Sequence, residues 1–338
     1  MMRLQEIEPK ALDSYVLKEH PEANFLQTSS WGKVHEKDGR KVFYLGLFND
    51  KKLVGTSVTI LKAAKRGRYL EIPGGPLLDW DGDIKTLRFF LKEIAKIADR
   101  EKCVFVRMRP NIADTDKHQK LAERLGLVKS PMHLHAEHTV MLDITKSEDE
   151  LMTEMRRQTR YEVRRAQKLG IKVSYETSEK AFNDFYDLQL ETAERQGFIP
   201  SSRHMVLSQH EVFGDKARIY TATLDGKVLA KGEVLLQAPE AIYHEAASTL
   251  EGRKLPGAYA LQWQIIQDAK VLGLKRYNLF GIAPPNSPNH RYAGVTTFKT
   301  GFGGEQVAYL SAHDLVIRKT HYRLVHLLET IRKKKRHL

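Results

Sequence analysis

The sequence predicts a mixed α/β protein (α+β) made of two tandem subdomains with the same fold. The first observation is length, because 338 residues can form two cores of roughly 150 residues each. The second is composition, since 41% hydrophobic and 29% charged residues are typical of a globular chain. The third is a repeat: two distant stretches show the same order of predicted elements.

Each stretch begins with apolar or alternating runs separated by turn residues, as in an antiparallel strand meander. A loop rich in Gly or Pro follows, and then a helix and one further strand. The first stretch has strands at 41–48, 53–61, 69–72 and 104–108, a loop at 73–76 and a helix capped by Asp83. The second has strands at 218–224, 228–236, 242–247 and 276–280, a loop at 252–257 and a helix through Leu261, Ile265 and Ala269. This order is similar to the middle of the acyltransferase fold shared by the GNAT acetyltransferases, so two GNAT-like subdomains are expected.

The boundary between the subdomains is expected near residue 146. A single long helix is predicted over 145–170, and Ser147 with Glu150 would form the capping box that starts it. The expected subdomains are 1–146 and 147–312.

A C-terminal helix completes the predicted order. After a strand at 306–311, the spacing of apolar residues predicts a helix over 313–335, and the segment 313–338 is expected to pack on the first subdomain. The basic run 332–336 is interpreted as a solvated helix end, with attraction to RNA or to an anionic membrane as the alternative.

Charge and cysteine content limit the class of protein. The 55 basic and 42 acidic residues give a formal charge of +13, which favours a polyanionic partner such as RNA, anionic lipid or a nucleotide diphosphate. The first residues lack the apolar core of a signal peptide, no run is apolar enough to cross a bilayer, and the single Cys103 lies in an apolar strand. A cytoplasmic protein without disulfides is therefore expected, and no spacing of histidines and cysteines predicts a metal site.

The strongest local pattern lies between residues 277 and 304. The run YNLFGI at 277–282 is followed by GVTTFKTGFGG at 294–304. This pair resembles two motifs of the FemABX family of aminoacyl-tRNA-dependent peptidyltransferases, Tyr-Asp-x-x-Gly-Ile and Gly-x-x-x-Phe-Lys-x-Gly-Phe-Gly-Gly. Asn278 stands where the family usually has an acid. The absence of a coiled-coil arm resembles the short, FemX-like members. Further landmarks occur in the family's order at 27–31, 72–76, 160–170 and 192–198.

The resemblance implies a donor site at Phe298 and Lys299. The family lysine contacts the tRNA end and stabilises the negative charge that develops on the carbonyl oxygen during aminolysis of the ester. The phenylalanine shapes the aminoacyl pocket. The alternative is structural, with a lysine on a helix flank and a phenylalanine in the core.

The resemblance also implies residues that bind the acceptor. Arg203 occupies the place of a family arginine that binds the phosphates or peptide of the precursor, and His35 aligns with a family lysine, with Lys33 two residues away as the nearest cation. A solvated loop arginine is the alternative for Arg203. Because Arg109 stands where the family often has an aspartate, no protein base is assigned.

The resemblance to the FemABX family implies a non-ribosomal peptidyltransferase. It would move an amino acid from aminoacyl-tRNA, its co-substrate, to an amine on the stem peptide of UDP-MurNAc-pentapeptide or a lipid-linked muramyl peptide, without another cofactor. A monomer is expected, and peripheral membrane contact is left open. The alternatives are a CoA-dependent GNAT-type N-acyltransferase, which would hold pyrophosphate at the loop 252–258, and a non-catalytic RNA-binding module.

Overall fold

The computed structural model describes residues 1–64 and 67–335, and the chain divides into two compact units. Unit 1 contains Met1–His138, Pro284–Arg291 and Val307–Leu338, and unit 2 contains Thr139–Ala283 and Tyr292–Gln306. The boundary expected near residue 146 lies inside unit 2, because the strand that precedes it, β7 (His138–Asp143), belongs to the second sheet.

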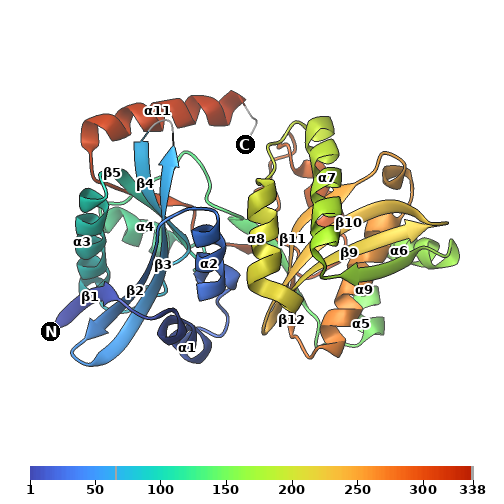
Figure 1. Ribbon diagram of the computed structural model, residues 1–338, viewed down its shortest axis with the longest axis horizontal. Coiled ribbons are helices and arrows are strands. Elements are labelled where there is room, and N and C mark those ends of the chain that lie inside the picture. The colour runs from blue at the N-terminus through green and yellow to red at the C-terminus, as the bar shows by residue number, and fades with distance from the viewer. Residues whose placement is uncertain (65–66, 336–338) are drawn as a thin grey trace. The chain divides into compact units, whose positions relative to one another are not determined.

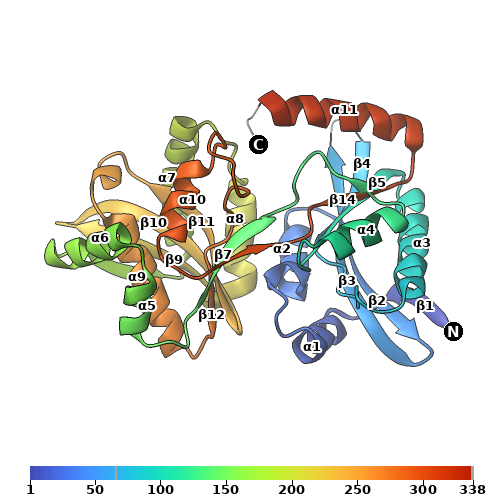
Figure 2. The ribbon, with the colours of Figure 1, turned by 180° about the vertical axis from the view of Figure 1, so that it is seen from behind.

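The sheet of unit 1 has the order β1-β2-β3-β4-β5-β14-β6, of which Figure 1 labels β1 to β5 and Figure 2 labels β14. Its β4 and β5 strands are parallel and connected through α3, whereas the other neighbouring pairs are antiparallel. The predicted meander, helix and strand are therefore all present. The strands are β1 (Met2–Glu6), β2 (Val42–Asn49), β3 (Lys52–Ala64), β4 (Gly67–Gly74), β5 (Cys103–Pro110), β6 (Val128–Lys129) and β14 (His313–Val316).

One face of this sheet is apolar. The helix α3 begins after Asp83, whose side chain accepts a hydrogen bond from the Lys85 backbone N–H, as the cap prediction requires. The buried face of α3 packs with Leu70, Ile72 and Met108 of the sheet into one core. The helices of unit 1 are α1 (Pro9–Glu19), α2 (Ser29–Lys37), α3 (Ile84–Arg100), α4 (Asp116–Arg124) and α11 (Lys319–Lys335), with the short 3₁₀ helix Phe25–Gln27.

The sheet of unit 2 repeats this plan with the order β13-β7-β12-β11-β10-β9-β8. The strands are β7, β8 (Lys172–Glu176), β9 (Ala217–Leu224), β10 (Lys227–Gln237), β11 (Glu240–Ser248), β12 (Arg276–Asn278) and β13 (Glu305–Ala308). The helices are α5 (Glu148–Glu154), α6 (Arg157–Lys168), α7 (Glu179–Gln196), α8 (Arg203–Phe213), α9 (Gly257–Val271) and α10 (Ala293–Thr300), with short 3₁₀ helices at Gly214–Lys216 and Gly252–Lys254. Helices α7 and α8 cover one face of the sheet, and α5, α6, α9 and α10 cover the other (Figures 1 and 2).

The prediction of one helix over 145–170 was wrong, although its capping box between Ser147 and Glu150 is confirmed. The chain forms α5 and then α6, because Met155 and Arg156 are extended, with ψ of 141° and 142°. The extended backbone lets the Arg156 N–H donate to the Gly301 carbonyl at 2.9 Å. The break therefore ties the start of α6 to the glycine-rich segment that follows Lys299.

The predicted helix start at 313 was also wrong. Residues 313–316 form β14, which pairs with β5 and β6, and the helix α11 begins only at Lys319. Short apolar runs fit a strand or a helix equally well, and here the pairing with β5 decides. Of the predicted basic run, Arg336 lies outside the described residues.

Candidate active site

The two parallel strand pairs, β4 with β5 and β11 with β12, differ in the number of residues over which they are paired. In unit 1, β4 and β5 remain paired from Arg68 and Cys103 to Gly74 and Pro110. In unit 2, β11 and β12 pair at only three positions, the last being Ile242 with Asn278. Beyond it β11 continues to Ser248 paired with β10 but no longer with β12. Of these two pairs, only the second opens. Backbone polar groups need partners, so the split strand edge can receive a substrate.

Lys299 lies at this split. Its Nζ donates a hydrogen bond of 2.9 Å to the carbonyl of Gly281, just beyond β12, and lies 5.9 Å from the ring centre of Tyr243, the first β11 residue past the split. The residue is only 8% exposed. Burial lowers the pKa of Lys299 from 10.5 to about 7, because a desolvated ammonium is disfavoured. The amine can therefore change its charge near neutral pH.

Glycines let α10 bring Lys299 to this position. A Cβ at Gly301 would lie 2.2 Å from the Thr159 hydroxyl oxygen of α6, and one at Gly304 would lie 2.6 Å from the carbonyl oxygen of Met141 in β7. Gly304 also has a φ of +79°, which favours glycine. The glycine run after Lys299 thus allows close packing of backbone on α6 and β7.

Phe298 belongs to an aromatic cluster. Its half-buried ring makes edge contacts with Tyr259 at 5.0 Å and Phe302 at 5.3 Å between ring centres. Tyr259 lies in the first turn of α9, so Phe298 connects α10 to that helix start. Phe298 can therefore pack in the core and also form part of a pocket wall, because its ring remains partly exposed.

Asn278 explains how the chain leaves β12. Its side-chain oxygen accepts hydrogen bonds from the Thr139 hydroxyl and from the Phe280 N–H, at 2.5 and 2.9 Å. Its amide donates to Glu240 at 2.7 Å, which a carboxylate at this position could not do. These bonds hold Phe280 at a φ of +57° and so direct Gly281 toward Lys299.

A buried histidine and glutamate lie beside the same split, and the sequence analysis missed them. The register between β10 and β11 shifts after the pair Glu233 and Glu245, so His244 bulges and its Nδ1 lies 3.2 Å from a carboxylate oxygen of Glu233. The His244 ring is 5.7 Å from that of Phe280. Burial opposes charge on His244, but the Glu233 carboxylate outweighs it and raises the pKa of the histidine. The neutral imidazole of His244 can therefore accept a proton that Glu233 stabilises.

Arg203 lies on the α7 and α8 side of the sheet. Its guanidinium donates to Asn183 at 2.7 Å, pairs with Asp187 and stacks over the Tyr186 ring at 4.6 Å. Glu233 faces the same side, because its register partner Glu245 is hydrogen-bonded to α7. Phe298 belongs to the layer of α9. The site residues of unit 2 therefore approach the split from both faces of the sheet.

Unit 1 holds the other two residues predicted to bind the acceptor, Lys33 and His35, and their exposure differs sharply. Lys33 is exposed on α2, whereas His35 is 2% exposed. Arg40 is 2.7 Å from Nδ1 of His35, and because a guanidinium only donates, the proton of the neutral ring sits on Nε2. Burial, followed by the charges of Lys62 and Arg40, lowers the pKa of His35 far below 6.5. His35 therefore cannot supply the charge of the lysine that it replaces.

A second cation near His35, besides Arg40, is Lys62, which was not predicted from the sequence. Its Nζ lies 3.4 Å from Glu71, and His135 lies 4.0 Å from the same carboxylate. Burial lowers the pKa of Lys62. Lys62, Glu71 and Arg107 share the face of the sheet opposite the α3 core. Unit 1 thus presents a row of ionic side chains on one sheet face.

The fold defines the class of protein. Two mixed sheets, each with one parallel pair connected through a helix, form a tandem acyltransferase fold of the GNAT kind, and a buried lysine lies at the split of the second. The chain belongs to the FemAB family, whose model matches residues 7–129, 130–231 and 225–330.

Individual relatives agree with this assignment. Aminoacyltransferase FemB of Staphylococcus epidermidis is 23% identical over 416 aligned residues, which cover 98% of this chain and 99% of FemB. The alignment is longer than this chain, so FemB has residues without a counterpart here. The protein is accordingly an aminoacyltransferase.

Solved structures confirm the predicted fold. The crystal structure of FemX superposes with a TM-score of 0.82 at 17% identity, covering 96% of this chain and 100% of FemX. A tandem GNAT protein from the clavulanic acid biosynthesis pathway gives a TM-score of 0.58 at 12% identity, covering 94% and 99% of the two chains. The mixed architecture of two tandem GNAT-like subdomains is therefore the observed one.

Proposed function

We propose that the protein transfers an amino acid from aminoacyl-tRNA to an amine on the stem peptide of a peptidoglycan precursor. The observation that carries this proposal is the buried amine of Lys299 at the split between β11 and β12. Membership of the FemAB family and the aminoacyltransferase relative FemB support it.

In the proposed reaction the precursor amine attacks the ester carbonyl of the charged tRNA. A C–N bond forms, the ester C–O bond breaks, and the ribose oxygen leaves with a proton. The carbonyl oxygen gains negative charge on the way, and the Lys299 ammonium stabilises it. The Lys299 pKa of about 7 reflects burial alone, and the negative charge that arrives with the tRNA end would raise this pKa and favour the ammonium.

The attacking amine must lose its proton, and His244 is the proposed acceptor. Glu233 orients the imidazole through Nδ1, and the proton would be taken by the ring's other nitrogen, Nε2. The acceptor substrate would enter from the side of α7 and α8, where Arg203 can contact its phosphates or peptide. The aminoacyl ester would lie against Phe298 on the other side. Lys33, which is exposed, is the proposed contact to the precursor from unit 1. The Nε2–H of His35, predicted beside it, has no partner among the described residues but is buried away from such a contact.

The CoA-dependent alternative receives less support. Its pyrophosphate loop would be 252–258, but three of the backbone N–H groups there already have partners. Gly252 donates to the Thr249 hydroxyl at 2.9 Å, Lys254 to the Glu251 carbonyl and Leu255 to the Gly252 carbonyl. A Cβ at Gly252 would also lie 1.9 Å from the Leu229 carbonyl oxygen, so the loop is packed directly on β10.

The decisive experiment compares Lys299→Met with the parent, using charged tRNA and both a nucleotide-linked and a lipid-linked acceptor. Loss of the charge is expected to lower kcat by ~10² to 10³. Lys270→Met is the matched control, because this lysine also donates to a backbone carbonyl, that of Ile144 at 2.8 Å, and plays no part in the proposed chemistry. Activity of Lys299→Met within a few-fold of the parent would contradict the role of Lys299, and turnover of acetyl-CoA would favour the alternative enzyme class.

His244→Gln tests the proton acceptor separately. The rate of the parent should rise with pH through the raised pKa of His244, since only the neutral ring accepts a proton. The variant should lose this rise and react more slowly by ~10² or more. Glu233→Gln should shift the rise to lower pH, because the carboxylate that stabilises the imidazolium is gone. An unchanged pH profile in both variants would exclude His244 as the base.

A further inference from the structure

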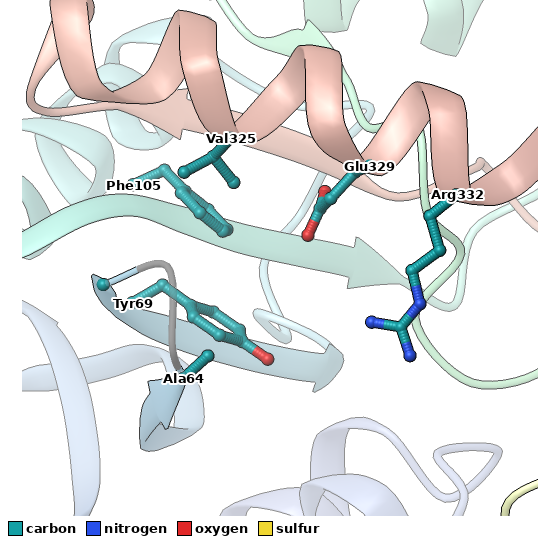
Figure 3. A pocket seen from close by; sticks show the side chains of 7 residues that line it. Ala64, Tyr69, Phe105, Val325, Glu329 and Arg332 are labelled. Carbon is teal, nitrogen blue, oxygen red and sulfur yellow. The ribbon is translucent and has the colours of Figure 1, made fainter.

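The helix α11 is held on unit 1 by one face. Tyr322 and Val325 are buried, the Tyr322 ring is 5.7 Å from that of Phe105 in β5, and Glu329 accepts a hydrogen bond of 2.8 Å from Arg107. Figure 3 shows Val325, Glu329 and Arg332 on the side of the helix that lies over Tyr69 and Phe105. These side chains line a pocket of about 280 Å³. The inner face of α11 therefore packs on unit 1 and lines this pocket.

A second apolar stripe lies on another face of the same helix. Leu324, Leu327, Leu328 and Ile331 follow each other at spacings of three, one and three, which places them in one line. They are exposed by 56%, 57%, 37% and 44%. A single exposed leucine needs no explanation, but four in a line form a contiguous apolar patch on the surface.

The patch is bordered by positive charge. Helix α11 contains six Lys and Arg residues and one acid, Glu329, which is turned inward to Arg107. Arg323 is exposed beside the leucines, and Lys334 and Lys335 are exposed at the end of the helix. In the described part of the chain no carboxylate forms an ion pair with any of these three cations. The outer side of α11 thus combines aliphatic side chains with unneutralised cations.

We infer that this outer face of α11 binds the surface of a membrane containing anionic lipid. Aliphatic side chains enter the boundary between headgroups and acyl chains, and flanking lysines and arginines meet the anionic headgroups. An RNA would contact the cations but leave the leucines in water. A second copy of the chain would bring two strongly cationic helices together. No helix in the described ranges is long and apolar enough to cross a bilayer, so the attachment is peripheral.

This inference bears on the choice of acceptor. An enzyme held at a lipid surface meets an acceptor that is itself carried on lipid, so a lipid-linked muramyl peptide becomes the favoured substrate. That choice rests on the proposed function, whereas vesicle binding is measured without either substrate. Failure of one therefore leaves the other to be judged by its own experiment.

The experiment is co-sedimentation of the full chain with sucrose-loaded vesicles. Vesicles of phosphatidylglycerol mixed with phosphatidylcholine should bind the protein, and vesicles of pure phosphatidylcholine should bind it at least about ten-fold more weakly. The double variant Leu324→Gln with Leu327→Gln should lose at least about ten-fold in binding to the anionic vesicles. Leu17→Gln on α1 is the control, because Leu17 is 70% exposed and lies apart from the cationic helix, and it should bind like the parent.

Insertion of the leucines has its own readout. A Leu327→Cys variant labelled with an environment-sensitive dye should shift to shorter wavelength on anionic vesicles, since Cys103 is buried and should not react. The inference is overturned if the chain does not bind anionic vesicles, if the double variant binds them as the parent does, or if the emission of the dye does not shift. It is also overturned if the double variant binds vesicles normally but loses tRNA binding or self-association.

Discussion

At the scale of single residues, the central feature is Lys299, whose burial destabilises the fold and lowers the pKa of its amine. Burial without a carboxylate partner lowers the Lys299 pKa from 10.5 to about 7, which corresponds to a destabilisation on the order of a few kcal/mol at neutral pH. The unfolded chain keeps its proton up to pH 10.5, whereas the folded chain releases it near pH 7. The destabilisation is therefore complete below pH 7 and disappears as the pH rises to 10.5.

This argument predicts the effect of Lys299→Met on stability. At pH 7 the variant should be more stable than the parent by a few kcal/mol, because methionine fills a similar volume without a charge to desolvate. At pH 10 the gain should fall to about 1 kcal/mol or less, because this pH lies just below the unfolded pKa of 10.5 and removing the proton on folding then costs little free energy. Urea denaturation at the two pH values measures both, and an equal gain at both would contradict the low pKa of Lys299.

The sequence identified some site residues and missed others for a physical reason. The motif around Phe298 and Lys299 is continuous, so a local pattern reveals it. Glu233 and His244 meet only because the β10 and β11 hairpin turns near Pro239. The register beside the turn would place Glu233 opposite His244, and the bulge shifts its partner to Glu245. Folding the two runs about Pro239 could have revealed the pair, but the bulge that points His244 at Glu233 leaves no local signal.

At the scale of elements, the packing of α10 depends on its glycines. Gly304 has a positive φ, and a Cβ there would lie too close to the backbone carbonyl of Met141. A Cβ at Gly294, in the first turn of α10, meets nothing within 4 Å. The same segment therefore offers two glycines with opposite requirements. Gly304 is needed for close approach of the backbone, and Gly294 is replaceable.

Substitution of these two glycines should give opposite results. Gly304→Ala should destabilise the protein by about 1 to 3 kcal/mol, because the strained φ and the contact with the Met141 carbonyl force the backbone to move. Gly294→Ala should be neutral or stabilise by up to about 1 kcal/mol, since alanine favours the helix. Urea denaturation of both variants measures the difference. Equal effects at the two positions would show that φ and close packing at Gly304 do not matter.

Element prediction succeeded where periodicity and caps agreed and failed where tertiary contacts decided. Asp83 and Ser147 cap helices as predicted, and the two meanders lie where alternation placed them. The break at Met155 depends on a distant carbonyl, that of Gly301, and β14 depends on pairing with β5. A short apolar run contains neither piece of information.

At the scale of the whole molecule, the chain passes between the units more than once. Unit 1 is completed by Val307–Leu338, which supplies both β14, the neighbour of β5, and α11. The Tyr309 N–H donates to the Glu137 carbonyl at 2.8 Å, so the two parts of unit 1 lie side by side. Unit 1 is thus one compact body made from separated pieces of sequence.

This organisation predicts how fragments behave. The fragment 1–138 should not fold alone, because β5 would lose β14, and Phe105 would lose its cover of Tyr322 and Val325. A chain in which a short Gly/Ser linker joins 1–138 to 307–338 should fold. Circular dichroism and proton–nitrogen NMR spectra compare the two, and a cooperatively folded 1–138 fragment would show that β14 and α11 are dispensable.

The late position of β14 has a consequence for biosynthesis. The ribosome makes β1 to β6 first, yet the strand that lies between β5 and β6 emerges only after the whole of unit 2 has been translated. Until then the apolar edge of β5 has no strand partner on that side, and such edges recruit other chains. The part of the protein that is made first is therefore the part that matures last, and nascent unit 1 is where this chain should depend most on chaperones.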